Sequence, residues 1–168
     1  MEQMNQALLA KAGWELSGLR NGLWHSILSS NYVQNTTFWL TSPKSLDSLM
    51  WKGILKTKEL LSKGRCFQIF NGRLVNIWSD PWILTLKDFK PTLNLNMESS
   101  HQSIKVSDII LNNPKSWDIH KMKNLFDQTS ITEILKIPLT TRVQDEDKEV
   151  WSLNHSGKYS VKQFIRRL

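Results

Sequence analysis

The stretch from Asn71 to Trp82, Asn-Gly-Arg-Leu-Val-Asn-Ile-Trp-Ser-Asp-Pro-Trp, constrains the fold of this chain more than any other segment. Asn71 and Gly72 both tolerate a positive φ angle, which the two central positions of a type I′ hairpin turn require. Short runs rich in β-branched and aromatic residues lie on either side of this pair. The pattern therefore predicts a β-hairpin with arms at 66–71 and 73–78.

The second arm is expected to end at Asp80-Pro81, because proline lacks the N–H that a strand ladder uses and aspartate can hydrogen-bond the turning backbone. Trp78 and Trp82 add large apolar area on either side of this stop. Aromatic side chains on a ribbon can stack unpaired bases, but they more often belong to a core. We interpret six residues as a structural motif without catalytic chemistry: Asn71, Gly72, Trp78, Asp80, Pro81 and Trp82.

Composition favours an ordered, intracellular protein. The chain has 168 residues, 40% of them hydrophobic, and eight tryptophans, which is enough to build a real core. No apolar run reaches the roughly 20 residues that a membrane span needs, and the N-terminus lacks the pattern of a secretory signal. A single cysteine excludes an intrachain disulfide. We expect a cytoplasmic or nuclear protein with no membrane partner.

The net charge of +7 favours an anionic partner, with RNA or DNA first, because binding to phosphates releases counterions and needs no particular motif. Residues 1–91 carry 11 Lys/Arg and 6 Asp/Glu, whereas residues 92–168 carry 11 and 9. An anion-binding face is therefore expected in the first half. A basic surface with no such partner is the alternative.

Helical spacing predicts an amphipathic helix at the N-terminus and a longer helix that begins at a Ser45 cap and stops at Gly64. The apolar face expected for the longer helix consists of Leu46, Leu49, Met50, Ile54 and Leu61. Basic residues cluster around its second half and continue into the hairpin. The candidate phosphate contacts are Lys52, Lys56, Lys58, Lys63, Arg65 and Arg73. A solvated helix face is the alternative interpretation.

Downstream of the motif, 85–105 resembles a linker or mobile loop, and 106–138 contains short helices, one of them capped by Ser116. A small strand pair is expected at 150–153 and 159–161, followed by a C-terminal helix that a longer parent would continue. The predicted fold is α+β, mostly helical, with a central β-hairpin and a small C-terminal strand pair. The expected segments are 1–84, 85–105 and 106–168.

The chain shows no catalytic signature. Asp145-Glu146-Asp147 is the one dense carboxylate cluster, and adjacent side chains diverge, so we interpret it as a solvated acidic turn. The four histidines and Cys66 lack zinc-ligand spacing, and Cys66 is expected to have a small apolar role beside Phe67. No glycine-rich phosphate loop is present. We therefore predict no metal, no cofactor and no enzymatic activity.

The order of several short motifs resembles the downstream part of plant LINE-type (non-LTR) retrotransposon reverse transcriptases, over nearly the whole chain. The residues that carry the resemblance are Asn5–Trp14, Leu23-Trp24, Trp51–Ile54, Lys63-Gly64, Asn71-Gly72, Ile77–Trp82, Ile137–Leu139, Asp147–Trp151 and Gly157–Lys162. In that family this region follows the polymerase palm and precedes a zinc-binding segment and, often, a ribonuclease H domain. The resemblance therefore implies a relation to plant open reading frames that are commonly described as ribonuclease H or reverse transcriptase proteins.

The resemblance implies a non-catalytic segment that binds nucleic acid and helps to position template or primer. It places the paired aspartates of the palm upstream and the zinc ligands beyond Leu168, and it implies polymerase and zinc-binding domains of a parent polyprotein as partners. The competing hypothesis is a structural or protein-interaction module whose tryptophans dock a neighbouring domain. Burial of Trp78 and Trp82 would distinguish the two.

Overall fold

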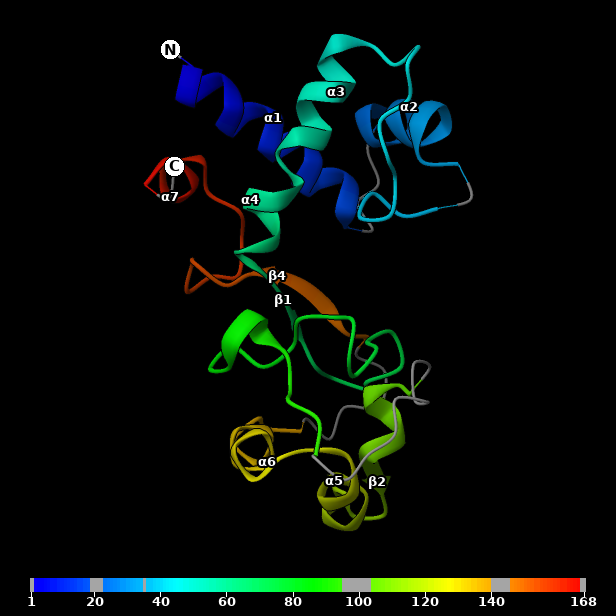
Figure 1. The fold of residues 1–168 in the computed structure, drawn as a ribbon, viewed down its shortest axis with the longest axis vertical. Helices are drawn as coiled ribbons and strands as arrows, with labels where there is room; N and C mark the ends of the chain where they lie inside the picture. Colours follow the sequence, from blue (N-terminus) through cyan, green and yellow to red (C-terminus); the bar gives the residue numbers. More distant parts are fainter. Residues whose placement is uncertain (1, 19–22, 35, 95–103, 140–145, 167–168) are drawn as a thin grey trace. The chain divides into compact units, whose positions relative to one another are not determined.

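The computed structural model describes residues 2–18, 23–34, 36–94, 104–139 and 146–166 (Figure 1). These residues form two compact units. Unit 1 is Met1–Gly64 with Trp151–Leu168, and unit 2 is Arg65–Val150. The chain thus passes between the units at 64/65 and at 150/151, whereas the predicted segments meet at 84/85 and 105/106. Residues 95–103 of the predicted linker, Asp145 and Leu168 lie outside the described residues.

Unit 1 is built from helices drawn from both ends of the sequence. They are α1 (Glu2–Ser17), α2 (Leu23–Tyr32), α3 (Leu49–Lys56), α4 (Lys58–Ser62) and α7 (Val161–Ile165). Helix α1 contacts each of the other four. Figure 1 shows α7, in red, beside the blue α1. The first and the last described helices are therefore both part of unit 1 and in contact with each other.

The long helix predicted from Ser45 to Gly64 is wrong in its start, its continuity and part of its face. Ser48, not Ser45, caps α3, with its Oγ accepting the Trp51 N–H at 3.2 Å. Thr57 separates α3 from α4, and its hydroxyl donates to the Ile54 carbonyl at 2.7 Å. Of the expected apolar face, Leu46 and Leu49 are 97% and 88% exposed and Met50 is 42% exposed, whereas Ile54 and Leu61 are buried.

Aromatic residues dominate the core of unit 1. Trp151 is 1% exposed, and its ring lies 5.3 Å from that of Trp14 and 5.0 Å from that of Tyr159. A Cβ on Gly64 would lie 2.5 Å from the Trp151 ring, so glycine is required there for the ring to fit. Trp51 stacks on Tyr32 at 4.5 Å. Such rings bury large areas, which suits a unit made of short helices.

Unit 2 has shorter elements joined by long loops. They are β1 (Arg65–Gln68), η1 (Lys87–Phe89), η2 (Val106–Ile109), β2 (Ile110–Asn112), β3 (Lys115–Trp117), α5 (Ile119–Leu125), α6 (Gln128–Leu135) and β4 (Lys148–Trp151), whose last residue belongs to unit 1. Strands β2 and β3 pair antiparallel, with Ile110 opposite Trp117. Ser116, expected to cap a helix, lies within β3, and Asp118 caps α5 instead, its carboxylate accepting the Lys121 N–H at 3.1 Å.

The α+β class, with helices predominating and two small strand pairs, is confirmed. The strand partners differ from the prediction. Strand β1 pairs with β4 rather than with 73–78, so the predicted central hairpin and the predicted C-terminal pair each contribute one strand to a single ladder. In 73–78, Asn76 forms an isolated bridge with Lys105. The hairpin among the described residues is β2–β3.

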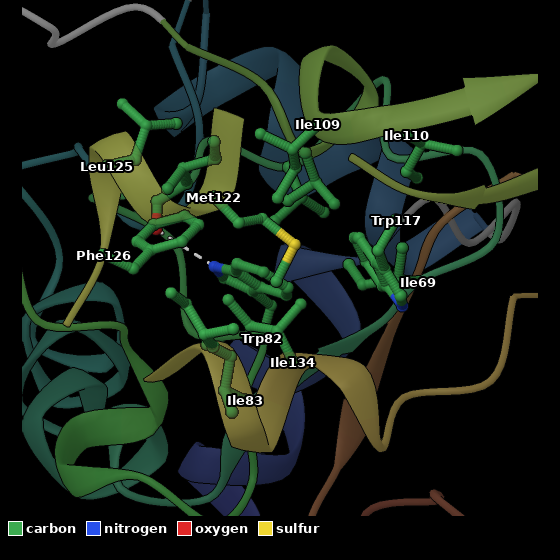
Figure 2. Packing of buried hydrophobic residues seen from close by; sticks show 14 residues of the cluster. Ile69, Trp82, Ile83, Ile109, Ile110, Trp117, Met122, Leu125, Phe126 and Ile134 are labelled. Carbon is green, nitrogen blue, oxygen red and sulfur yellow. Dashed lines mark hydrogen bonds between the residues drawn. The ribbon is translucent and has the colours of Figure 1, made fainter. Parts of the chain in front are cut away.

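Figure 2 shows the core of unit 2, which gathers around Trp82. This side chain is 2% exposed, and its Nε1 donates to the Ile77 carbonyl at 3.0 Å, the dashed line in the figure. Trp117 lies 6.2 Å from it, ring to ring. Most of the remaining core is aliphatic, including Ile69, Ile83, Ile109, Ile110, Met122, Leu125 and Ile134.

Candidate functional site

The six cations predicted to contact phosphate are divided between the two units. Lys52, Lys56, Lys58 and Lys63 lie in unit 1, and Arg65 and Arg73 lie in unit 2. The structure therefore brings four of them together in one compact body. Three of these four line the same groove.

This lysine groove of unit 1 has a volume of about 540 Å³. One wall is the loop from Trp39 to Pro43, and the other comes from α3 and α4. Its lining residues are Trp39, Leu40, Thr41, Ser42, Pro43, Lys52, Leu55, Lys56 and Lys58. The described lining contains no aspartate or glutamate. The groove thus combines apolar walls with three cationic side chains.

Lys58 holds the loop against the helices. Its Nζ donates to the Trp39 carbonyl at 3.2 Å and also to the Thr41 carbonyl, and it lies 5.2 Å from the centre of the Phe38 ring. Burial lowers the pKa of the Lys58 ammonium, because water no longer fully solvates the charge. Lys58 is therefore a positioning residue whose charge lies at the groove wall.

Lys52 and Lys56 lie one helical turn apart on α3, so their side chains share a face. The Nζ of Lys52 donates to the Ser45 carbonyl at 2.8 Å. Lys56 is exposed at the C-terminal end of the helix. Both can reach an anion in the groove while the helix backbone keeps their spacing fixed.

Lys63, which does not line the groove, lies 3.7 Å from Glu59 in an exposed pair. Arg65 is 14% exposed and forms ion pairs within unit 2 with Glu149 and, at 3.9 Å, with Asp80. Its guanidinium also lies 4.9 Å from the Phe67 ring. Arg73 is exposed. Of the three, Arg65 contributes mainly to the packing of unit 2.

The Asn71-Gly72 segment is a loop around a buried carboxylate. Oδ1 of Asp147 accepts the backbone N–H groups of Phe70, Asn71 and Gly72 at 2.8 to 3.1 Å, and its Oδ2 accepts that of Leu74 at 3.1 Å. The interpretation of Asp147 as part of a solvated acidic turn is therefore wrong: it is 6% exposed. Four converging N–H groups satisfy the charge, and they also explain why no two-residue hairpin turn forms.

Gly72 does adopt the positive φ angle that its sequence context predicts, at 71°. Its carbonyl accepts the Ser107 N–H at 2.9 Å. A Cβ at this position would lie 2.5 Å from the Ser107 nitrogen. Glycine is thus required by conformation and by close backbone approach.

The remainder of the motif is also structural. Oδ1 of Asn76 accepts the N–H groups of Trp78 and Ser79, and Oδ2 of Asp80 accepts that of Asn76 at 2.8 Å. Pro81 is buried, and its carbonyl accepts the Phe67 N–H at 2.8 Å. The Trp78 ring packs on Phe126 at 5.2 Å. With Trp82 in the core, these contacts give no support to docking through the two tryptophans.

No described group of three His, Cys, Asp or Glu residues could hold a metal ion. Cys66 is 1% exposed, and burial raises the pKa of its thiol to about 12, so it is unsuited to act as a nucleophile. Within the described ranges no helix has both the length and the apolar composition to cross a membrane. These observations leave the lysine groove as the candidate site.

Sequence reasoning missed two residues that matter here. Trp39 falls in a polar, irregular segment, and its one signal is the aromatic pair with Phe38 followed by Leu-Thr-Ser-Pro. Asp147 lies in the acidic run predicted to be solvated, and no local signal indicates its role as an anchor, because its partners lie 73 to 77 residues away. Both roles depend on tertiary contacts that periodicity does not report.

Comparison with known proteins relates the chain to plant sequences. It is 24% identical to an Arabidopsis thaliana protein named "putative ribonuclease H protein", over 175 aligned residues that cover 99% of this chain. It is 32% identical, over 80 residues and 48% of its length, to an uncharacterized mitochondrial protein of the same plant. The chain spans 27% of the first relative and 52% of the second. No protein-family model and no solved structure matches it.

The predicted relation to plant proteins named for ribonuclease H is confirmed at this low identity. The narrower assignment to a LINE-type reverse transcriptase stays a prediction. Because the alignment with the first relative covers almost the whole chain, both units take part in the similarity.

Proposed function

We propose that this chain is a non-catalytic, nucleic-acid-binding segment of a retrotransposon-derived protein of the LINE reverse-transcriptase type, and that it helps to position template or primer. The similarity of nearly the whole chain to a plant protein named for ribonuclease H supports this origin. The net charge of +7 supports an anionic partner. In the parent protein, polymerase and zinc-binding domains would flank the segment.

The lysine groove is the observation that carries the proposal. Lys52, Lys56 and Lys58 line one surface of one compact unit, with no described acidic residue among them. Clustered ammonium groups without carboxylate partners attract phosphates and contact them without reading sequence. Lys63 and Arg73 are exposed and add to the basic surface of their own units.

The proposal assigns no catalytic role to the carboxylates. Asp147, the one described buried aspartate, directs its oxygens at four backbone N–H groups, which supports a structural role. Glu149 pairs with Arg65 and Asp80 with the turn backbone. With Mg²⁺ and a labelled RNA–DNA hybrid, we expect neither cleavage nor primer extension; reproducible turnover by the purified chain would overturn this part.

The decisive experiment is a salt titration of binding to single-stranded RNA and DNA, followed by fluorescence anisotropy. The logarithm of affinity should fall linearly with the logarithm of salt concentration, with a slope of about −0.7 per phosphate contact. The double variant Lys52→Gln/Lys56→Gln should flatten the slope by about 1.4 for two lost contacts.

The matched control is Lys123→Gln/Lys162→Gln, which removes the same charge from two exposed positions that do not line the groove. This control should leave the slope nearly unchanged. Equal losses in the two double variants would mean that net charge alone drives binding. No salt-dependent binding by the unmodified chain would refute the proposed function.

A further inference from the structure

The lysine groove has two kinds of wall. Trp39, Leu40, Pro43 and Leu55 give it apolar surface, and Lys52, Lys56 and Lys58 give it positive charge. A surface that only tracked a duplex backbone would need the charge but not the apolar wall, because duplex bases are stacked inside the helix. The combination suits a ligand with an apolar flat part and an anionic part.

We infer that the groove takes one unpaired nucleotide of a single strand, with its base against the Trp39–Leu40 wall and a neighbouring phosphate at Lys52 and Lys56. This inference rests on the proposed function and adds the class of ligand and the place where it binds. An aromatic side chain beside lysines is the arrangement by which proteins bind single strands without reading sequence.

The size of the groove agrees with this occupant. Its volume of about 540 Å³ is large enough for a base and its sugar. The loop wall is fixed rather than loose, because Lys58 donates to the carbonyls of Trp39 and Thr41 and the Thr41 hydroxyl donates to the Thr37 carbonyl at 2.9 Å. The Trp39 ring also packs edge-to-face on Phe38 at 5.3 Å, which sets its orientation.

The experiment compares a labelled oligothymidylate with a hairpin duplex of equal phosphate number, at one salt concentration. We expect the full chain to prefer the single strand. Trp39→Leu keeps an apolar side chain but removes the aromatic stacking face, and it should weaken single-strand binding by about tenfold while leaving duplex binding within twofold. Circular dichroism of the variant checks that unit 1 stays folded.

A second pair of variants separates the groove from general charge. Leu40→Glu places a carboxylate in the groove at a side chain that is 77% exposed, and Leu46→Glu makes the same change at one that is 97% exposed and does not line it. We expect Leu40→Glu to weaken single-strand binding roughly tenfold and Leu46→Glu to change it less than twofold. Neither position is buried, so both variants should fold.

Two results would overturn the inference while leaving the proposed function intact: equal affinity for single strand and duplex, or equal effects of Leu40→Glu and Leu46→Glu. A third result, displacement of the oligonucleotide by polyglutamate as readily as by unlabelled oligothymidylate, would overturn the inference and the proposed function together. The last would point to an acidic polypeptide instead. If no salt-dependent binding to any strand occurs, the inference and the proposed function fail together.

Discussion

The two units each have a small core, and different interactions stabilise the two cores. Unit 1 packs aromatic rings between helices, with Trp14, Trp51 and Trp151 all at most 5% exposed. Unit 2 has mostly aliphatic residues around Trp82 and long loops, and it ties one of these loops down with the carboxylate of Asp147. Ring packing needs close shape agreement, whereas a buried charge needs every hydrogen bond to be made. The units should therefore fail in different ways.

Two residues four positions apart carry this contrast. Asp147 anchors the Asn71-Gly72 loop of unit 2, and Trp151 fills the core of unit 1. The short segment 147–151 thus contributes a stabilising residue to each unit. Substitutions at the two positions should separate the stability of one unit from that of the other, and multi-unit proteins often unfold in more than one step.

The largest effect is expected for Trp151→Ala. Loss of a ring that contacts Trp14, Tyr159 and Phe164 should lower the free energy of unfolding of unit 1 by about 3–5 kcal/mol. Urea denaturation followed by tryptophan fluorescence measures it. Trp151→Phe is the control: its loss should be much smaller, because the indole N–H has no hydrogen-bond partner among the described residues. Similar losses in both variants would contradict the ring-packing account.

Asp147→Asn is expected to have the next largest effect, about 2–4 kcal/mol, because it replaces charge-assisted hydrogen bonds and points an amide N–H at backbone donors. The loss should fall on unit 2. The rate at which the Cys66 thiol reacts with a disulfide reagent measures this loss, since Cys66 is 1% exposed, lies in that unit and reacts faster when the unit opens more often. Glu146→Gln, at the exposed neighbouring carboxylate, should leave the thiol protected. Equal reactivity in the two variants would contradict the anchor.

High pH tests the same division with one acid in each unit, the buried Cys66 thiol in unit 2 and the partly buried Tyr159 phenol in unit 1. Burial raises the pKa of the Cys66 thiol from 9.0 to about 12 and that of the Tyr159 phenol above its ordinary value. A raised pKa in the folded state means that the unfolded chain loses the proton first. The contribution of these two protonated groups to the free energy of unfolding is thus fully present below pH 9 and falls as the pH rises toward 12. For Cys66 the fall is up to about 1.4 kcal/mol per pH unit.

The variants that test this are Cys66→Ala for unit 2 and Tyr159→Phe for unit 1. Each should flatten the decline in stability between pH 9 and 11 in its own unit and leave the other unit unchanged. The reactivity of the thiol cannot be used in this experiment, because Cys66→Ala removes it. Hydrogen exchange measured by mass spectrometry follows the stability of both units at once. An unchanged slope in both variants would exclude the two groups as its source.

Local signals in the sequence predicted the N-terminal helix and the positive φ angle of Gly72, because periodicity and turn chemistry act over a few residues. They misplaced the face of α3. Leu46 and Leu49 satisfy a helical stripe, but the helix begins only at Leu49, and the side that packs is set by Trp51 and Leu55. The choice between two apolar stripes depends on what the helix packs against.

The partner of β1 and the lysine groove could not be predicted for the same reason. Strand β1 pairs with a segment some 80 residues away, because the nearer candidate is drawn into a loop by Asp147. The groove needs Lys58 to bring the loop at Trp39 against α3 and α4, a contact between residues 19 positions apart. The sequence predicted that the lysines cluster, but it did not predict the apolar wall formed by Trp39 and Leu40.

The smallest expected effects come from one helix cap in each unit, and they test whether local damage stays local. Oγ of Ser48 accepts the Trp51 N–H in unit 1, and Oδ1 of Asp127 accepts the Ser130 N–H at 2.8 Å in unit 2. Replacing either with alanine should reduce stability by about 1 kcal/mol. In hydrogen exchange, Ser48→Ala should lower protection along α3 and Asp127→Ala along α6. Loss of protection in both helices from a single variant would mean that the two units unfold as one.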